Sequence, residues 1–276
     1  MAALALWATA AGVDALEIRV EPRAPRPGDV VRVEVLGVDN PGRVSCLFRS
    51  KSYPLYAVGP GRMRALIGLE AVEEPGRFAL EVTRRPFLLP EETKTVNITV
   101  AAREFGHREL RMPKKKAALP KKPEAEDAIR TIRAALRTET ARQLWEGAFL
   151  RPAQGRLTSA YGHSRNVNRK KWSWHKGVDI AAPEGHQVAA PNAAKVALAG
   201  RYPVQGGTVI LDHGQGVMSA FLHLRSSEVE AGDEVPKGRT IGAIGGGGFS
   251  TGTHLHWGVY VHGAAVDPEQ WLRRRF

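Results

Sequence analysis

The stretch Thr253-His254-Leu255-His256-Trp257 is the most informative part of this chain of 276 residues. In a β-strand, residues two positions apart point to the same side. A strand here directs the imidazoles of His254 and His256 to one site and Leu255 to the opposite side, toward a core. A pair of half-exposed histidines on an edge strand is the alternative interpretation, and the surrounding sequence has to decide between the two.

Two other short stretches carry histidines in the same region. In His175-Lys-Gly-Val-Asp179, the histidine and the aspartate can meet one metal ion if the chain turns at Gly177. In Phe221-Leu-His-Leu224, the apolar neighbours predict a buried strand whose His223 opens onto a cleft. Taken singly, the first stretch can also be a surface loop. The second can also be a strand whose histidine is buried in the core with its hydrogen bonds made. Eight of the nine histidines nevertheless lie in the C-terminal region, at His163, His175, His186, His213, His223, His254, His256 and His262.

Together these residues match the needs of a catalytic zinc site, which uses His nitrogen and carboxylate oxygen and keeps three protein ligands plus water. His175, Asp179 and one of His254 or His256 supply such a set, and two histidines remain for proton transfer. The sequence has no His-Glu-x-x-His helix and no Gly-x-Ser-x-Gly motif. The lone Cys46 lies in an apolar run and is expected to be a buried, inert thiol. A metal site is therefore favoured over a serine or cysteine nucleophile.

Outward from these motifs, the sequence predicts a mainly β protein with two folded parts. Glycine-rich turns separate short apolar runs after Gly147, which predicts an antiparallel β domain. Six or seven short strands with Pro-Gly turns before residue 101 predict an immunoglobulin-like β-sandwich. A lysine- and proline-rich linker is expected between them, followed by a helix from Glu124 to Trp145. The predicted division is a signal-peptide remnant (1–15), the sandwich (16–100), the basic linker and helix (101–148) and the C-terminal domain (149–276).

The amino-acid composition limits the classes of binding partner that this protein can have. The formal net charge is +12 and the isoelectric point is about 10.1, which favours a polyanionic partner or surface. No nucleic-acid recognition motif is present, and no run reaches the ~18 apolar residues that span a membrane. Residues 1–15 are small and apolar without Lys or Arg, and they resemble the later regions of a signal peptide. We therefore expect export, although a disordered or strand-forming N-terminus is the alternative.

With these motifs in order, the region from about Phe149 to Leu272 resembles the lysostaphin-like zinc metallopeptidases of peptidase family M23. Thr253 and Phe221 stand where proline and tyrosine are common in the family, and neither is a ligand position. The resemblance rests on Gly155-Arg-Leu-Thr-Ser-Ala-Tyr-Gly162, His175-Lys-Gly-Val-Asp-Ile-Ala-Ala-Pro183, Val209-Ile-Leu-Asp-His-Gly214, Phe221-Leu-His-Leu224, Gly232-Asp-Glu-Val-Pro-Lys-Gly238, Ser250-Thr-Gly-Thr-His-Leu-His256 and Val266-Asp-Pro268.

The resemblance implies one Zn²⁺ per chain, with His175, Asp179 and His256 as its ligands. It implies His223 and His254 as the catalytic histidines, with their separate roles left open. The implied activity is zinc-dependent endopeptidase cleavage of peptide bonds in peptidoglycan stem peptides or cross-links. His213 is not a family ligand and is expected to be structural. The segment 166–174 departs from the family pattern and is expected to flank the cleft.

A second function stays open: a noncatalytic module on the same fold that activates a cell-wall amidase. All five implied site positions are filled, which favours catalysis, and a nucleic-acid-binding function would explain none of the histidines. We expect a monomer that acts on peptidoglycan in the periplasm or outside the cell, without an integral membrane segment. Peripheral contact with the envelope is expected through the basic linker. The sequence does not decide whether the sandwich targets the enzyme or shields it.

Overall fold

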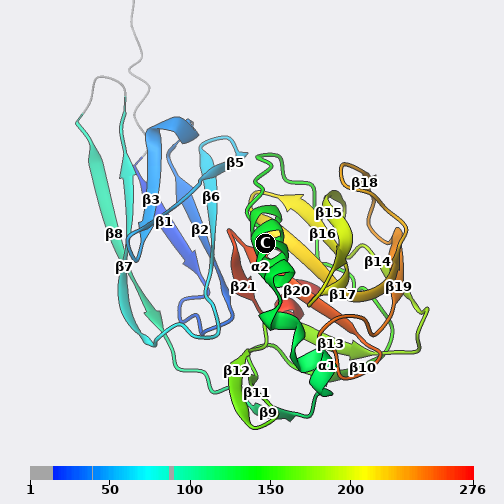
Figure 1. The fold of residues 1–276 in the computed structure, drawn as a ribbon. Helices are drawn as coiled ribbons and strands as arrows, with labels where there is room; N and C mark the ends of the chain where they lie inside the picture. Colours follow the sequence, from blue (N-terminus) through cyan, green and yellow to red (C-terminus); the bar gives the residue numbers. More distant parts are fainter. Residues whose placement is uncertain (1–14, 39, 87–89) are drawn as a thin grey trace, which may run out of the picture.

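The structure, a computed structural model, describes residues 15–38, 40–86 and 90–276. An N-terminal β-sandwich and a larger C-terminal β domain lie side by side, with a connecting segment between them in the chain (Figure 1). The prediction of a signal-peptide remnant concerns residues 1–14 almost entirely, and these lie outside the described residues. In the described part, no helix has both the length and the apolar character needed to cross a membrane.

The N-terminal sandwich consists of two four-stranded sheets with the orders β1-β2-β6-β5 and β4-β3-β7-β8, and each neighbouring pair is antiparallel. This division matches the A-B-E-D and C-F-G sheets of an immunoglobulin-type sandwich with one added strand beside C. Every second residue of β2, namely Val31, Val33 and Val35, is buried in its core. Cys46 is a free thiol in the same core, and burial raises its pKa to about 12. The strands are β1 Glu17–Glu21, β2 Val30–Leu36, β3 Val44–Phe48, β4 Lys51–Tyr53, β5 Tyr56–Gly59, β6 Arg62–Gly68, β7 Gly76–Arg84 and β8 Glu92–Val100, with a 3-10 turn η1 at Pro41–Arg43.

The C-terminal domain is built on a ten-stranded antiparallel sheet with the main order β10-β13-β20-β17-β16-β15-β18. Strand β20 lies between β13 and β17 and is buried along its whole length. The stretch that begins with Leu255 is therefore a central strand, and the edge-strand alternative is wrong. The elements are β10 Arg156–Ser159, β13 Val178–Ala181, β14 Gln187–Ala189, β15 Ala194–Tyr202, β16 Gly206–Gly214, β17 Val217–Ser227, β18 Glu234–Val235, β19 Thr240–Ile244, β20 Leu255–Val261, β21 Ala264–Val266 and the 3-10 helix η3 Pro268–Leu272.

The connecting segment is more regular than its composition predicts. Its strand β9 (His107–Leu110) pairs in parallel with β11 (Ser164–Val167), which pairs in turn with β12 (Lys170–Trp174). This part of the segment is thus a strand of a three-stranded sheet beside the C-terminal domain (Figure 1). The short helix α1 (Lys114–Ala117), the 3-10 turn η2 (Leu119–Lys121) and the helix α2 (Pro123–Ala135) follow it.

Helix α2 ends at Ala135, so the predicted extension of the helix to Trp145 is wrong. Beyond the helix, the backbone bonds to the C-terminal sheet instead of to itself. The Leu144 amide donates to the His213 carbonyl at 2.8 Å, and the Gln215 amide donates to the Thr140 carbonyl. Trp145 then enters the core of the C-terminal domain, where it is 3% exposed.

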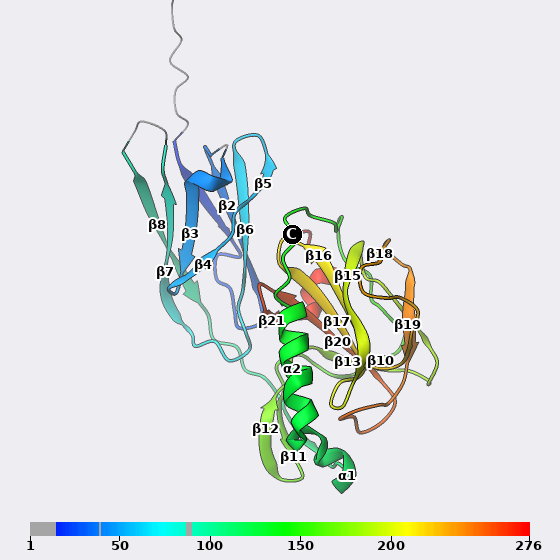
Figure 2. The ribbon, with the colours of Figure 1, turned by 45° about the horizontal axis from the view of Figure 1, so that its top comes forward.

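The sandwich is attached directly to the C-terminal domain, next to β20 and β21 (Figure 2). Val30 and Leu66 of the sandwich belong to the same apolar cluster as the C-terminal core. The Gly28 carbonyl accepts hydrogen bonds from the Asp267 amide at 2.8 Å and from Gln270 Nε2 at 2.9 Å. Apolar and polar contacts therefore both cross the boundary between the two parts.

Candidate metal centre and catalytic cleft

Three of the predicted site residues converge because of strand register. Asp179 on β13 is the direct antiparallel partner of His256 on β20, and His175 lies three residues before the first residue of β13. The distances are 2.9 Å from His175 Nε2 to Asp179 Oδ1, 2.9 Å from His175 Nε2 to His256 Nδ1 and 3.0 Å from His256 Nδ1 to Asp179 Oδ1. One ligand atom from each residue thus lies within 4.8 Å of the others, close enough to share a metal ion.

Gly177 allows the two strands to approach this closely. A Cβ at this position would lie 2.3 Å from the Trp257 carbonyl oxygen and 2.9 Å from His256 Cε1. Any larger residue would push β13 away from β20 beside the convergent side chains. The chain bends at Lys176 and Gly177, as the sequence suggested, and the glycine also permits close strand packing.

The surroundings of His175 and Asp179 prepare them for a cation. His175 Nδ1 lies 2.8 Å from the Ala160 carbonyl, to which it can donate only as the Nδ1–H tautomer, leaving the Nε2 lone pair directed at the site. Burial lowers the pKa of His175 to about 4, so the ring is neutral at pH 7. Burial alone would raise the pKa of Asp179, but its close polar contacts with the His175 and His256 rings hold it well below its usual range. Neutral imidazoles with an ionised carboxylate are the donor set that zinc requires, so the residues present fit this metal.

His223 reaches the cleft through an irregularity in β17. The β16–β17 register shifts between the pairs Gly207–Leu224 and Val209–Phe221, so β17 carries one extra residue there. His223 lies in this β-bulge with φ 66°, a conformation that is uncommon outside glycine. Its Nδ1 contacts the Gly247 carbonyl at 2.8 Å, which leaves Nε2 free.

His254 lies beside His223, with their ring centres 4.9 Å apart. Its Nδ1 contacts the Gly252 carbonyl at 2.9 Å, and its Nε2 lies 3.7 Å from Asp179 Oδ1. Burial lowers the pKa of both rings, that of His223 to about 3. Both histidines are therefore neutral at pH 7 and able to accept a proton at Nε2.

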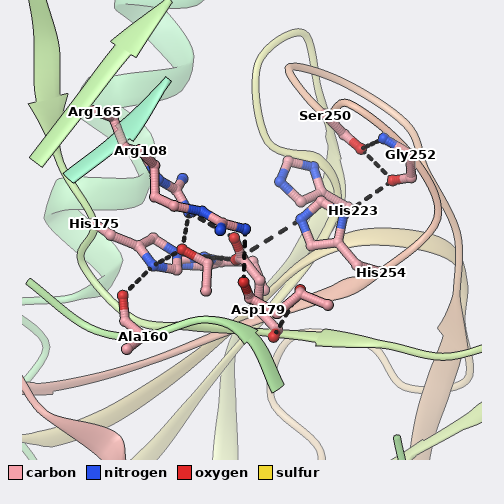
Figure 3. A network of polar contacts seen from close by, with 12 residues as sticks. Arg108, Ala160, Arg165, His175, Asp179, His223, Ser250, Gly252 and His254 are labelled. Carbon is pink, nitrogen blue, oxygen red and sulfur yellow. Dashed lines mark hydrogen bonds and ion pairs between the residues drawn. The ribbon is translucent and has the colours of Figure 1, made fainter. Parts of the chain in front are cut away.

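Two arginines that the sequence reasoning missed lie on the opposite side of Asp179. Figure 3 shows Arg108 and Arg165 on one side of this carboxylate and His223 and His254 on the other. Arg165 Nη2 donates to Asp179 Oδ2 at 2.5 Å and to Ser159 Oγ at 3.1 Å. This contact holds the carboxylate oxygen that faces away from His175 and His256. No local pattern marks these arginines, because β9 and β11 lie more than fifty residues apart in the chain.

Asp179, His223 and His254 line a cleft of about 270 Å³. Trp172 from β12 stacks on Phe249 at 4.9 Å between ring centres, so side chains from two walls meet there. Lys116 Nζ from α1 donates to the Gly246 and Ser250 carbonyls at 3.1 and 2.8 Å and holds the glycine-rich loop. Trp172 lies in the segment 166–174 that was expected to flank the cleft, and it does line it. Among the described residues of the sandwich, none lines this cleft.

His213 lies apart from the cleft. It is fully buried, with Nδ1 2.9 Å from the Ala193 carbonyl and Nε2 2.9 Å from Ser219 Oγ. Both ring nitrogens thus have partners within the core, in agreement with the structural role expected from the sequence.

Comparison with known proteins identifies the C-terminal part of the chain. Residues 173–268 match the model of Peptidase family M23, and this range contains all five predicted site residues. The C-terminal domain belongs to peptidase family M23. A solved structure described as a candidate M23 peptidase from Pseudomonas aeruginosa matches 90% of this chain and 95% of its own, with 29% identity and a TM-score of 0.65. The similarity therefore extends beyond the M23 domain to the connecting segment and the sandwich.

Two curated relatives cover different shares of the chain. The DD-carboxypeptidase/endopeptidase Mpg of Neisseria meningitidis serogroup B is 34% identical over 113 residues, which are 41% of this chain and 26% of Mpg. The murein hydrolase activator EnvC of Escherichia coli is 26% identical over 227 residues, which are 77% of this chain and 51% of EnvC. The chain thus spans about a quarter of the length of the first of these relatives and half of the second.

Proposed function

We propose that this M23 peptidase is a zinc-dependent endopeptidase that hydrolyses peptide bonds in peptidoglycan stem peptides or cross-links. The supporting observation is the convergence of His175, Asp179 and His256 at the edge of a cleft that Asp179 lines together with His223 and His254. The name of the Neisseria relative, a DD-carboxypeptidase/endopeptidase, supports a substrate with D-amino acids. The net charge of +12 suits work on an anionic cell envelope.

In this proposal, one zinc ion is held by His175 Nε2, His256 Nδ1 and a carboxylate oxygen of Asp179. Bound there, zinc would polarise the scissile carbonyl and lower the pKa of a water ligand from 15.7 toward about 7. Arg165 keeps the Asp179 carboxylate oriented through its contact with Oδ2. The Ala160 carbonyl does the same for the His175 ring.

His223 and His254 are proposed to move protons. Each has its Nδ1 committed to a backbone carbonyl, so each presents Nε2 to the cleft. Their burial keeps them neutral, which lets one accept a proton from water and return it to the leaving amine. His254 is assigned the first step, because its Nε2 lies only 3.7 Å from Asp179 Oδ1 beside the metal ligands.

The test of this function is Asp179→Ala, compared with wild type on purified, defined muropeptides. Wild type should contain about one zinc per chain and yield products whose masses show hydrolysis of an amide bond. The variant should lose both zinc and turnover, because one of three ligands is gone. Survival of zinc binding and turnover in Asp179→Ala would show that the ligand assignment is wrong.

A second candidate function is activation of a separate cell-wall amidase, and the match to EnvC over 77% of the chain favours considering it. The complete set of three candidate ligands and two neutral histidines favours catalysis instead. Purified protein without zinc that stimulates an amidase, and that cleaves no muropeptide by itself, would support the activator function.

We further propose that the protein acts in the cell envelope, in the periplasm or outside the cell, as a monomer. We propose three structural units along the chain, which are the sandwich, the connecting segment and the peptidase domain. The end of the connecting segment is part of the peptidase core, because Ile132, Leu136 and Trp145 pack there. Because the described sandwich residues do not line the cleft, localisation on the wall is a better proposal for the sandwich than direct shielding of the site.

A further inference from the structure

Arg108 and Arg165 form a pair of like charges that the fold places directly opposite each other. In the parallel β9–β11 ladder, Arg165 is the register partner of Arg108, and both side chains line the cleft. Two like charges held on neighbouring strands at one cleft repel each other unless an opposite charge compensates them. The pairing therefore needs an anion nearby.

The described part of the cleft supplies too little negative charge for this pair. Of the described residues that line it, Asp179 is the one carboxylate, and its Oδ2 is bound by Arg165 while its Oδ1 faces the histidines. Arg108 has Nη2 on the Thr158 carbonyl at 2.8 Å, a neutral partner. With a divalent cation at the candidate metal centre, two arginines, one cation and one carboxylate sum to +3.

Arg165 also carries unused hydrogen-bonding capacity. Its Nε is buried and makes no hydrogen bond in the described structure, although its Nη2 makes two. Guanidinium groups bind carboxylates through paired N–H donors, more strongly than neutral donors do. The two arginines thus offer an anion several donors beside the candidate metal centre (Figure 3).

We propose that Arg108, together with Arg165, forms a subsite for a substrate carboxylate on the carbon bonded to the scissile nitrogen. This inference rests on the proposed function and specifies its substrate class. Such a carboxylate is present when the leaving residue is a terminal D-alanine, and also when the leaving nitrogen belongs to the D-centre of diaminopimelate in a cross-link. A bridge through a lysine side chain or an internal glycine lacks it.

The experiment compares matched peptides with the zinc-loaded full chain. One pair is a D-Ala–diaminopimelate cross-linked dimer with this carboxylate either free or converted to a carboxamide. A third peptide ends in D-Ala-D-Ala and separates the two sources of the carboxylate. Wild type should cleave the free acid at least about tenfold better in kcat/KM than the carboxamide, as expected for hydrogen bonds to a charged group.

Arg108→Met should lower cleavage of the free acid to about the level of the carboxamide and so remove this preference, whereas Arg108→Lys should keep part of it. Arg130→Met is the matched control, because Arg130 is an exposed arginine on α2 that pairs with Asp127 outside the cleft. It should behave like wild type on every peptide. Equal cleavage of acid and carboxamide by wild type, or an equal loss on both in Arg108→Met, would overturn the subsite.

Binding separates this inference from the proposed function. If no peptide is cleaved, the hydrolytic function is wrong, but calorimetry of the same peptides with zinc-loaded His223→Ala still tests the subsite. Binding of the acid about tenfold more tightly than the carboxamide, lost on adding Arg108→Met, supports the subsite. Equal affinity for both peptides refutes it.

Discussion

Gly177→Ala tests whether close strand packing builds the metal centre. The added Cβ would lie 2.3 Å from the Trp257 carbonyl oxygen, whereas real Cβ contacts essentially never fall below 3.0 Å. The strands must therefore separate by about 0.7 Å (3.0 minus 2.3) near this point. Metal-ligand distances are kept within about 0.2 Å. Asp179 lies two residues after Gly177 and is the register partner of His256. We therefore expect zinc affinity to fall about 10- to 100-fold, as it does when contacts that support metal ligands are lost.

The assay is zinc affinity by competition with a chelator, together with the free energy of unfolding. Crowding at this position should also cost about 1–3 kcal/mol of stability. Gly59→Ala is the matched control, because a Cβ there meets nothing closer than 4.0 Å. Zinc affinity that stays at the wild-type value in Gly177→Ala would refute the argument that this glycine sets the ligand geometry.

Three further predictions follow from the site and the core. His223→Ala and His254→Ala should each keep zinc and lose about 10²- to 10⁴-fold in turnover. Loss of zinc in His254→Ala would show that His254, and not His256, is the ligand. Burial lowers the pKa of His213 to about 4 from 6.5, so the unfolded chain binds the extra proton and stability falls as pH drops from 6.5 toward 4, by about 3 kcal/mol. His213→Asn should flatten this part of the stability–pH curve of the zinc-free protein, and an unchanged slope would contradict the assignment. Residues 123–276 should unfold at a higher temperature than residues 149–276, because the shorter piece lacks Trp145 and α2; equal melting temperatures would show that these contacts add nothing.

The sequence was sufficient to predict the parts of the site that depend on local patterns. Alternation around Leu255 predicted a strand, and the structure places this residue in the core. The two motifs with His175 and His256 come together because β13 and β20 are adjacent, although these two histidines lie 81 residues apart in the chain. The sandwich was predicted from strand spacing and turn residues, and its strand order agrees with the immunoglobulin type.

Features that depend on tertiary pairing could not be predicted in this way. Apolar spacing continues past Ala135, but the amide of Leu144 finds its partner on β16, so the helix stops early. The bulge at His223 requires the register of β16 against β17. Arg108 looks like part of a solvated linker until β9 is paired with β11, and only then does it become part of a cleft wall.

The pairing of β9 with β11 also limits how this protein can be recombined. An engineer who wished to exchange the sandwich for another targeting module would choose the lysine- and proline-rich stretch as the crossover point. A junction placed after β9 would discard one wall of the cleft, including Arg108, and a junction after α1 would also discard the lysine that holds the glycine-rich loop. Functional chimeras should therefore join the new module before His107 and keep everything downstream of it.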